Sequence, residues 1–143
     1  IKMRHKVLII GYGSAGERHK KILKEKLNIK NLSIFTKRKL KLITLKNKSE
    51  IVNFDPDIII ISNSTYKHLE TIKFIEKNFT RKTILVEKPV ANKFKKINKM
   101  KNTYFVAYQL RFHPVLINLK KLLKKQKILN VNIICNSFFR LEK

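Results

Sequence analysis

The chain has 143 residues, 43% hydrophobic and 30% charged, a composition that suits one globular domain and excludes a disordered protein. Lys and Arg number 34 against 9 Asp and Glu, and the resulting formal net charge of +25 would attract polyanions. No apolar run is long enough for a bilayer span or a signal peptide, and the single cysteine, Cys135, excludes an internal disulfide and a cysteine-based zinc site. We therefore expect a reducing, cytoplasmic location and no bound metal.

Apolar β-branched runs alternate with amphipathic segments, which predicts alternating strands and helices. In chain order we expect a strand at 6–10, a helix at 15–26, a strand at 32–36, a weak strand at 42–46, a helical turn at 50–54, a strand at 57–62, a helix at 68–79, a strand at 83–87, a helix at 94–100, a strand at 104–108, a basic amphipathic helix at 115–125 and a long strand at 128–139. This order predicts an α/β fold with a doubly wound parallel sheet. We place one domain at 1–125 and only the first strand of a second α/β domain at 126–143.

All three glycines of the chain lie in one motif, G-Y-G-S-A-G at 11–16, between the first expected strand and the first expected helix. This is G-x-G-x-x-G in the strand–turn–helix context that dinucleotide binding requires. Gly11 permits the tight turn, Gly13 lets the backbone approach a pyrophosphate, and Gly16 allows close helix packing. The alternative is a tight turn that binds no ligand.

The second expected strand ends in Thr36, Lys37 and Arg38. An NAD site usually carries an acidic residue here, about 20 residues beyond the last glycine of the motif, to bind the ribose 2′-hydroxyl. A hydroxyl followed by two cations suits a 2′-phosphate instead, so we expect NADP to be preferred over NAD. Because lysine is abundant throughout the chain, an incidental pair of cations is the alternative.

Polar residues also follow the strand at 57–62. Ser62 and Asn63 are small enough to leave room for a cofactor ribose and can cap the next helix. His68, at the start of that helix, is by itself more typical of a capping or packing residue than of a ligand-binding one.

The last two expected sites follow the strands at 83–87 and 104–108. Lys88, in the sequence E-K-P, would hold a positive charge beside a substrate hydroxyl or bond the cofactor ribose, and its bond to Pro89 is a candidate for the cis form. Gln109 suits a carboxamide, and Arg111 suits an anion or a structural role in the loop.

Four motifs in order, G-Y-G-S-A-G, S-N-S-T-Y-K-H, V-E-K-P and A-Y-Q-L-R-F-H-P, resemble those of the Gfo/Idh/MocA oxidoreductases over residues 6–114. The resemblance implies an N-terminal Rossmann domain, a nicotinamide cofactor and hydride transfer at a hydroxyl-bearing carbon of a sugar, cyclitol or nucleotide-sugar. It implies that Lys88 is catalytic. It also implies cofactor contacts from Gly11, Tyr12, Gly13, Ser14, Ala15, Gly16, Thr36, Lys37, Arg38, Ser62, Asn63, His68, Glu87, Lys88, Gln109 and Arg111.

The chain departs from the family pattern in two local features and in length. Asn63-Ser64 stands where the family usually has Thr-Pro, and the acidic residue after the second strand is missing. Members of the family are more than twice as long, and their proton-transferring residue lies in the second domain. We therefore expect a truncated oxidoreductase that binds cofactor better than it turns over a carbohydrate-type substrate, and whose full-length form could be a homo-oligomer.

Other classes of function compete with this one. Residues 88–141 carry thirteen basic residues and no acidic one, which favours a polyanion-binding module, but no zinc spacing, RNP-type signature or helix-turn-helix supports a specific nucleic-acid partner. The basic helix at 115–125 suits a membrane surface, although an ordinary exposed helix is the simpler interpretation. A regulatory protein that binds the cofactor without catalysis would share every binding residue.

Overall fold

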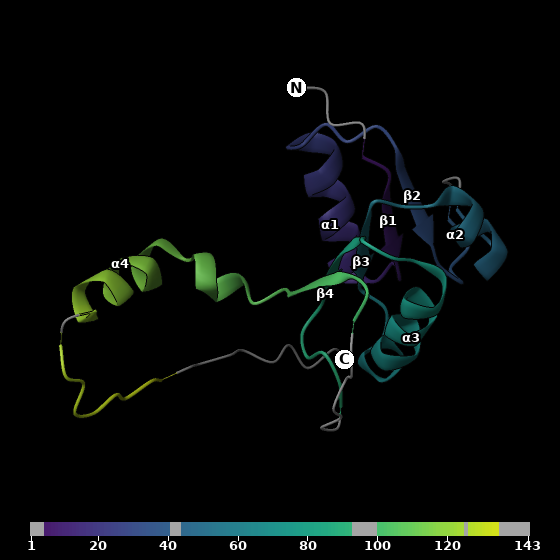
Figure 1. The fold of residues 1–143 in the computed structure, drawn as a ribbon. Helices are drawn as coiled ribbons and strands as arrows, with labels where there is room; N and C mark the ends of the chain where they lie inside the picture. Colours follow the sequence, from purple (N-terminus) through teal and green to yellow (C-terminus); the bar gives the residue numbers. More distant parts are fainter. Residues whose placement is uncertain (1–4, 41–43, 93–99, 125, 135–143) are drawn as a thin grey trace, which may run out of the picture. The chain divides into compact units, whose positions relative to one another are not determined.

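The computed structural model describes residues 5–40, 44–92, 100–124 and 126–134. It divides into two compact units, 1–108 and 109–143. The elements of the first unit are β1 (Val7–Ile10), α1 (Ser14–Glu25), β2 (Leu32–Phe35), α2 (Lys48–Phe54), β3 (Ile58–Ile61), the 3-10 turn η1 (Thr65–Lys67), α3 (His68–Asn78), β4 (Thr83–Val86) and β5 (Thr103–Val106) (Figure 1).

The five strands form one parallel sheet in the order β2-β1-β3-β4-β5. The chain runs from β1 to its neighbour β2 and then crosses to β3 on the other side of β1, so the strand order reverses beside β1. In open parallel sheets this reversal opens a crevice at the carboxyl ends of the strands, where ligands bind. The predicted doubly wound α/β fold is confirmed.

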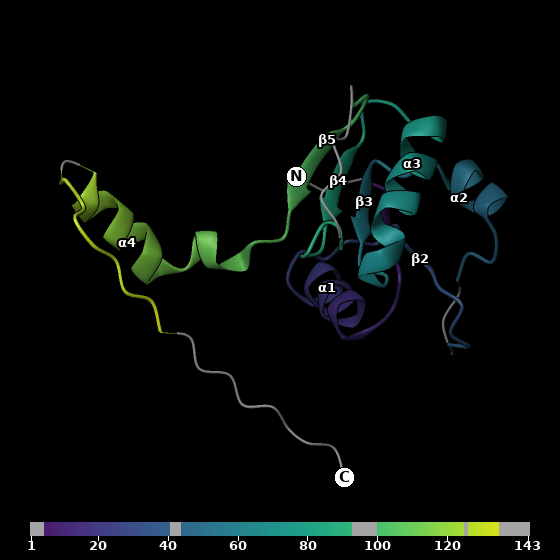
Figure 2. The same cartoon turned by 90° about the horizontal axis from the view of Figure 1, so that it is seen from below.

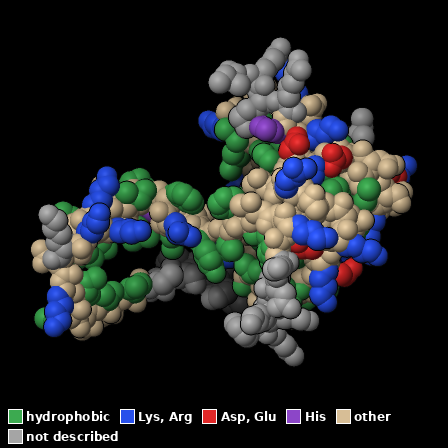
Figure 3. Space-filling model, viewed as in Figure 1, with side chains coloured by type: hydrophobic (Ala, Val, Ile, Leu, Met, Phe, Trp, Pro, Cys, Tyr) green, Lys and Arg blue, Asp and Glu red, His purple; other side chains and the backbone are tan. Residues whose placement is uncertain are grey.

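The helices cover both faces of the sheet, with α1 on one face and α2 and α3 on the other (Figure 2). The apolar side chains Leu23 of α1, Ile51 of α2 and Ile72 and Ile75 of α3 belong to the clusters packed against the sheet. On the face of the first unit shown in Figure 3, lysine and arginine side chains are scattered rather than gathered into one patch.

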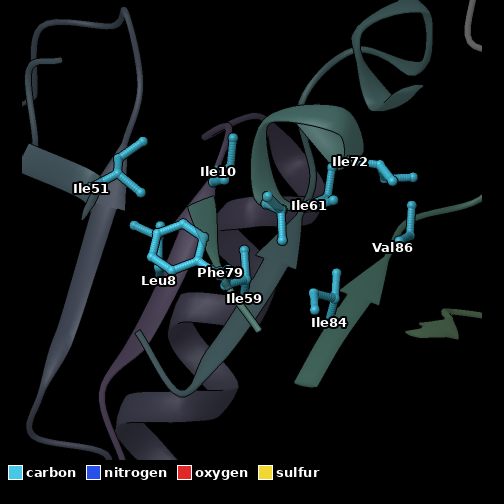
Figure 4. Close-up of a cluster of buried hydrophobic side chains, with 10 residues drawn as sticks. Leu8, Ile10, Ile51, Ile59, Ile61, Ile72, Phe79, Ile84 and Val86 are labelled. Atoms are coloured by element: carbon cyan, nitrogen blue, oxygen red, sulfur yellow. The ribbon is translucent and has the colours of Figure 1, made fainter. Parts of the chain in front are cut away.

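Two apolar clusters hold these layers together, one on each face. β1 and β3 contribute to both clusters because their residues are buried on both faces, as expected for central parallel strands. The larger cluster, toward α2 and α3, contains Leu8, Ile10, Ile51, Ile59, Ile61, Ile72, Ile75, Phe79, Ile84 and Val86 (Figure 4). The run of four isoleucines at 58–61 therefore fixes the middle of the sheet.

Most predicted elements are found within one or two residues of their expected bounds. α2 begins earlier than expected, because Asn47 caps it by accepting a hydrogen bond from the Glu50 amide at 2.9 Å. Of the weak strand at 42–46, Leu45 makes an isolated bridge to Phe35, and 42–43 lie outside the described residues. The helix expected at 94–100 lies almost wholly outside them as well.

The second unit contains the 3-10 turn η2 (Gln109–Phe112) and the helix α4 (Pro114–Leu123), with Pro114 in the first helical turn. The second compact unit begins at residue 109 and includes α4, and the domain bounds expected at 1–125 and 126–143 stay a prediction. Residues 128–134 form no strand, which corrects the expected strand at 128–139 for its described part. A strand requires a neighbour for its N–H and C=O groups, and no described strand pairs with this segment.

Among the described residues, no helix is long and apolar enough to cross a membrane.

Candidate functional site

The residues that follow β1, β3 and β4 are aligned at the carboxyl edge of the sheet. The amide of Gly11 donates to the carbonyl of Phe35 at 2.9 Å, that of Ser62 to Ile10 at 2.8 Å, and that of Glu87 to Ile61 at 2.9 Å. These bonds extend the ladder one residue past each strand. They bring the G-Y-G-S-A-G, S-N-S-T-Y-K-H and E-K-P motifs to one edge.

The glycine loop is packed tightly at two of its glycines and open at the third. Gly11 has φ +96°, and a Cβ there would lie 2.4 Å from the Asn63 nitrogen. A Cβ on Gly16 would lie 2.4 Å from the Gly11 carbonyl oxygen. A Cβ on Gly13 would meet no atom within 4 Å, although Gly13 is the N-cap of α1. The loop therefore leaves open space at the amino end of α1, where a helix presents free N–H groups to phosphate.

A cavity of about 700 Å³ lies along this edge. Its lining residues come from the ends of β1, β2 and β3 and from α2 and α3, and they are Ile10, Gly11, Tyr12, Gly13, Ser14, Ala15, Phe35, Thr36, Lys37, Arg38, Lys48, Ile51, Ser62, Asn63, Ser64, Lys67, Glu70, Thr71 and Phe74. Four of them are cationic and only Glu70 is acidic, so the cavity favours an anionic ligand. The open glycine edge, the helix terminus and the size of the cavity fit a dinucleotide.

Arg38 bridges the end of β2 and the glycine loop. Its guanidinium donates to the Tyr12 carbonyl oxygen at 3.1 Å, and its amide donates to the Thr36 hydroxyl at 3.2 Å. One contact leaves most of the guanidinium donors available. Lys48, which was not among the predicted site residues, enters the same cavity from α2 with its ammonium 3.5 Å from the Glu70 carboxylate. No local signal could identify Lys48, because lysine is common throughout the chain.

Asn63 and His68 connect the end of β3 to α3 and to the loop after β4. The Asn63 amide donates to the Thr71 hydroxyl at 2.9 Å, and the Asn63 Oδ1 is buried without a partner among the described residues. His68 is 1% exposed and lies outside the cavity lining. Its two ring nitrogens lie 3.0 Å from the carbonyl oxygens of Asn63 and Pro89. His68 thus links two motifs, and its contact with a cofactor stays a prediction.

Glu87 and Lys88 differ in their surroundings. The Glu87 carboxylate lies 2.7 Å from the Nε2 of His19, a residue of α1 that was not among the predicted site residues. Lys88 is exposed, and its peptide bond to Pro89 is cis. Contacts of Glu87 and Lys88 with a cofactor remain predictions.

Gln109 and Arg111 belong to η2 in the second unit, so their part in the site also remains a prediction. Within the ranges that the structure describes, no three His, Cys, Asp or Glu side chains form a group that could hold a metal ion.

Residues 5–105 match the profile of the Gfo/Idh/MocA family, described as an oxidoreductase family with an NAD-binding Rossmann fold. A comparison with curated proteins finds no significant match.

Solved structures share the fold at low sequence identity. Myo-inositol 2-dehydrogenase from Lactobacillus plantarum superposes with a TM-score of 0.71 at 20% identity, over 84% of this chain and 41% of that one. The WlbA dehydrogenase from Thermus thermophilus, in complex with NAD and UDP-GlcNAcA, has a TM-score of 0.71 at 17% identity, over 86% of this chain and 48% of that one. Scyllo-inositol dehydrogenase from Lactobacillus casei, with NAD(H) and scyllo-inositol, has a TM-score of 0.64 at 18% identity, over 88% of this chain and 42% of that one. The chain spans less than half the length of each.

Proposed function

The chain belongs to the Gfo/Idh/MocA oxidoreductase family, and from this premise we propose that it binds a nicotinamide dinucleotide at the carboxyl edge of its sheet, with NADP(H) preferred to NAD(H). The observation that carries the proposal is the cation-rich cavity that joins the open Gly13 to the end of β2. Anionic phosphates fit both ends of such a cavity.

The cofactor's parts are assigned by the chemistry of each strand end. The pyrophosphate lies at the amino end of α1, against Gly13, Ser14 and Ala15, where no side chain blocks its approach. The adenosine ribose lies beyond β2, near Thr36. The nicotinamide half then extends past Ser62 toward the ends of β3 and β4.

The preference for NADP(H) rests on charge. The ribose site lacks the acidic residue that would bond a 2′-hydroxyl and repel a 2′-phosphate. Lys37, Arg38 and Lys48 line the same cavity and supply cations for that phosphate. Arg38 is held by the Tyr12 carbonyl, which reduces the loss of side-chain entropy when it binds a phosphate.

The proposed reaction is hydride transfer at a hydroxyl-bearing carbon of a sugar, cyclitol or nucleotide-sugar, by the enzyme of which this chain forms the nucleotide-binding part. The structural neighbours include inositol dehydrogenases and a dehydrogenase in complex with a nucleotide-sugar, which supports this substrate class. The bound nicotinamide exchanges the hydride. Lys88 supplies a positive charge that orients the substrate hydroxyl or the nicotinamide ribose.

Titration of the purified chain with NADPH and NADH at moderate salt tests the cofactor assignment. The chain has no tryptophan, so the fluorescence of the reduced cofactor gives a clean signal. We expect saturable binding that is tighter for NADPH, because the charge-assisted contacts to the 2′-phosphate are absent with NADH. Arg38→Gln should weaken NADPH binding about tenfold and NADH binding less than twofold.

Lys39→Gln is the matched control for that variant. It removes the same charge from the adjacent position, which is exposed and outside the cavity lining. Equal losses in the two variants would mean that overall charge, and not a site at Arg38, holds the phosphate. Binding of both cofactors that disappears at moderate salt would contradict the dinucleotide assignment and favour general polyanion binding.

A further inference from the structure

We propose that His19 and His68 are positioning residues that hold Lys88 in place from the two faces of the sheet. Lys88 follows β4 directly, and each of its two sequence neighbours is bonded to one of these histidines. This inference rests on the proposed cofactor site. It identifies the residues that hold Lys88, the predicted catalytic lysine of that site, in position.

The first anchor comes from α1. His19 lies one turn after Gly16, and its Nε2 is 2.7 Å from the Glu87 Oε1. The two side chains are only 19% and 13% exposed, so solvent competes weakly for this bond. The Glu87 amide is bound to the Ile61 carbonyl at 2.9 Å, so both its backbone and its side chain are fixed.

The second anchor comes from the opposite face. His68 begins α3 and is 1% exposed. Its Nδ1 lies 3.0 Å from the Pro89 carbonyl oxygen and its Nε2 lies 3.0 Å from the Asn63 carbonyl oxygen. Backbone carbonyls only accept hydrogen bonds, so the ring nitrogen that carries the hydrogen donates to the carbonyl oxygen beside it. His68 thereby connects the residue after Lys88 to the end of β3, where the nicotinamide half is proposed to pass.

These two anchors explain how an exposed lysine can act from a defined position. A lysine has a long, flexible side chain and loses entropy when it is ordered, so a fixed backbone on both sides reduces the cost of placing its ammonium. Adjacent parallel strands are roughly 5 Å apart, which puts the end of β4 about 10 Å from the end of β1. That distance suits contact with the nicotinamide half and not with the pyrophosphate.

Crossed amide substitutions test the proposal. The amide nitrogen of glutamine reaches the position of imidazole Nε2, and that of asparagine reaches the position of Nδ1. At residue 19 the relevant atom is Nε2, so His19→Gln should keep the anchor and His19→Asn should lose it. At residue 68 the relevant atom is Nδ1, so His68→Asn should keep the anchor and His68→Gln should lose it.

Two ligands give the readout. NADPH needs Lys88, whereas 2′,5′-ADP carries only the adenosine half. We expect His19→Asn and His68→Gln to raise the Kd for NADPH about tenfold, and His19→Gln and His68→Asn to raise it less than threefold. The Kd for 2′,5′-ADP should change less than twofold in all four variants. In a Lys88→Met background the four histidine variants should have no further effect on NADPH.

Each contrary result has a distinct meaning. Equal NADPH affinities in all four variants, or equal losses for both ligands, would overturn the positioning role and leave His19 and His68 as packing residues. Further losses in the Lys88→Met background would overturn it too. Circular dichroism melting identifies any variant that fails to fold. If the variants of one histidine fail, the difference between the Asn and Gln variants of the other histidine still tests the proposal. If the unmodified chain binds neither ligand, the proposed function itself is wrong.

Discussion

The three glycines of the loop after β1 have different surroundings, although they form one motif in the sequence. Gly11 and Gly16 are needed by the fold, because any Cβ there would overlap the backbone. Gly13 has φ −90° and open space where a Cβ would be, so the fold itself does not require glycine at this position. The open position is best explained by the ligand proposed to occupy it.

Gly13→Ala should therefore leave the chain folded and reduce its affinity for NADPH. The added methyl would occupy the space assigned to the pyrophosphate, and we expect the Kd to rise at least tenfold. The melting temperature should change by only a few degrees. Fluorescence titration and melting of the same preparation check both parts.

Gly16→Ala is the contrasting variant. Its Cβ would lie 2.4 Å from the Gly11 carbonyl oxygen and 2.9 Å from the Ser62 hydroxyl oxygen, so the loop or α1 must move. We expect a loss of about 2 kcal/mol or more in the free energy of unfolding. A stable Gly16→Ala chain, or a Gly13→Ala chain with full affinity, would contradict this division of roles.

At the level of elements, a hydrogen-bonded cluster joins α3 to β5 at the end of the sheet remote from the cavity. The Glu76 carboxylate accepts from the Tyr104 hydroxyl at 2.8 Å, from the Asn102 amide at 2.7 Å and from the Lys101 backbone amide at 2.7 Å. The Asn102 amide also donates to the Phe79 carbonyl at 3.0 Å. Since β5 pairs with β4 only, this cluster supplies a second attachment for the edge strand.

Tyr104→Phe should destabilise the chain by about 1–2 kcal/mol, because the bond it removes ends on a carboxylate. Burial, followed by the bond to Glu76, raises the pKa of Tyr104 above its ordinary value, as expected for a hydroxyl that donates to a carboxylate. Urea denaturation at neutral pH measures the effect. Unchanged stability would mean that water replaces the lost bond.

The same cluster predicts how stability depends on acid. Burial raises the pKa of Glu76, but the hydrogen bonds from Lys101, Asn102 and Tyr104 outweigh burial and leave this pKa lowered from 4.5. A carboxyl with a lower pKa in the folded state stabilises the fold above its unfolded value and loses this contribution as the pH falls through the folded value. Below about pH 4.5, the free energy of unfolding should therefore fall less steeply in Glu76→Gln than in the unmodified chain. Urea denaturation between pH 7 and 3 measures this difference. An identical acid dependence in the variant would contradict this.

For the whole molecule, the proposed nucleotide site and the core belong to one unit. Every lining residue of the cavity and every residue of the two apolar clusters lies within 1–108. A chain that ends at Tyr108 should therefore fold and bind 2′,5′-ADP within about twofold of the affinity of the 143-residue chain. Isothermal titration calorimetry tests this expectation. A folded but non-binding short chain would show that the second unit contributes to the adenosine end.

The net charge of +25 also acts at this level. On the face of the first unit shown in Figure 3 the basic side chains are scattered, so we expect their attraction for polyanions to be non-specific and to fall steeply with salt. The cavity differs because four cationic side chains line the same space. Binding that survives moderate salt is thus the property that separates the site from the general charge.

The sequence by itself determined the order of strands and helices, the parallel α/β fold and the position of the glycine loop. These depend on local patterns, such as the isoleucine run at 58–61 or the glycine spacing at 11–16, which act over one element and its turn. For its described part, residues 128–134, the strand expected at 128–139 was an error of the same local reasoning, because an apolar run becomes a strand only beside a partner.

Only the tertiary structure decided which side chains meet. His19 and Glu87 are 68 positions apart, and they touch because the register of β1, β3 and β4 aligns their ends while α1 packs on one face. His68 reaches Pro89 in the same way from the other face, and Lys48 enters the cavity because α2 packs on that same face. Such contacts depend on strand register and helix packing together, which no local pattern contains, because periodicity identifies the face of an element but not the element that will lie against it.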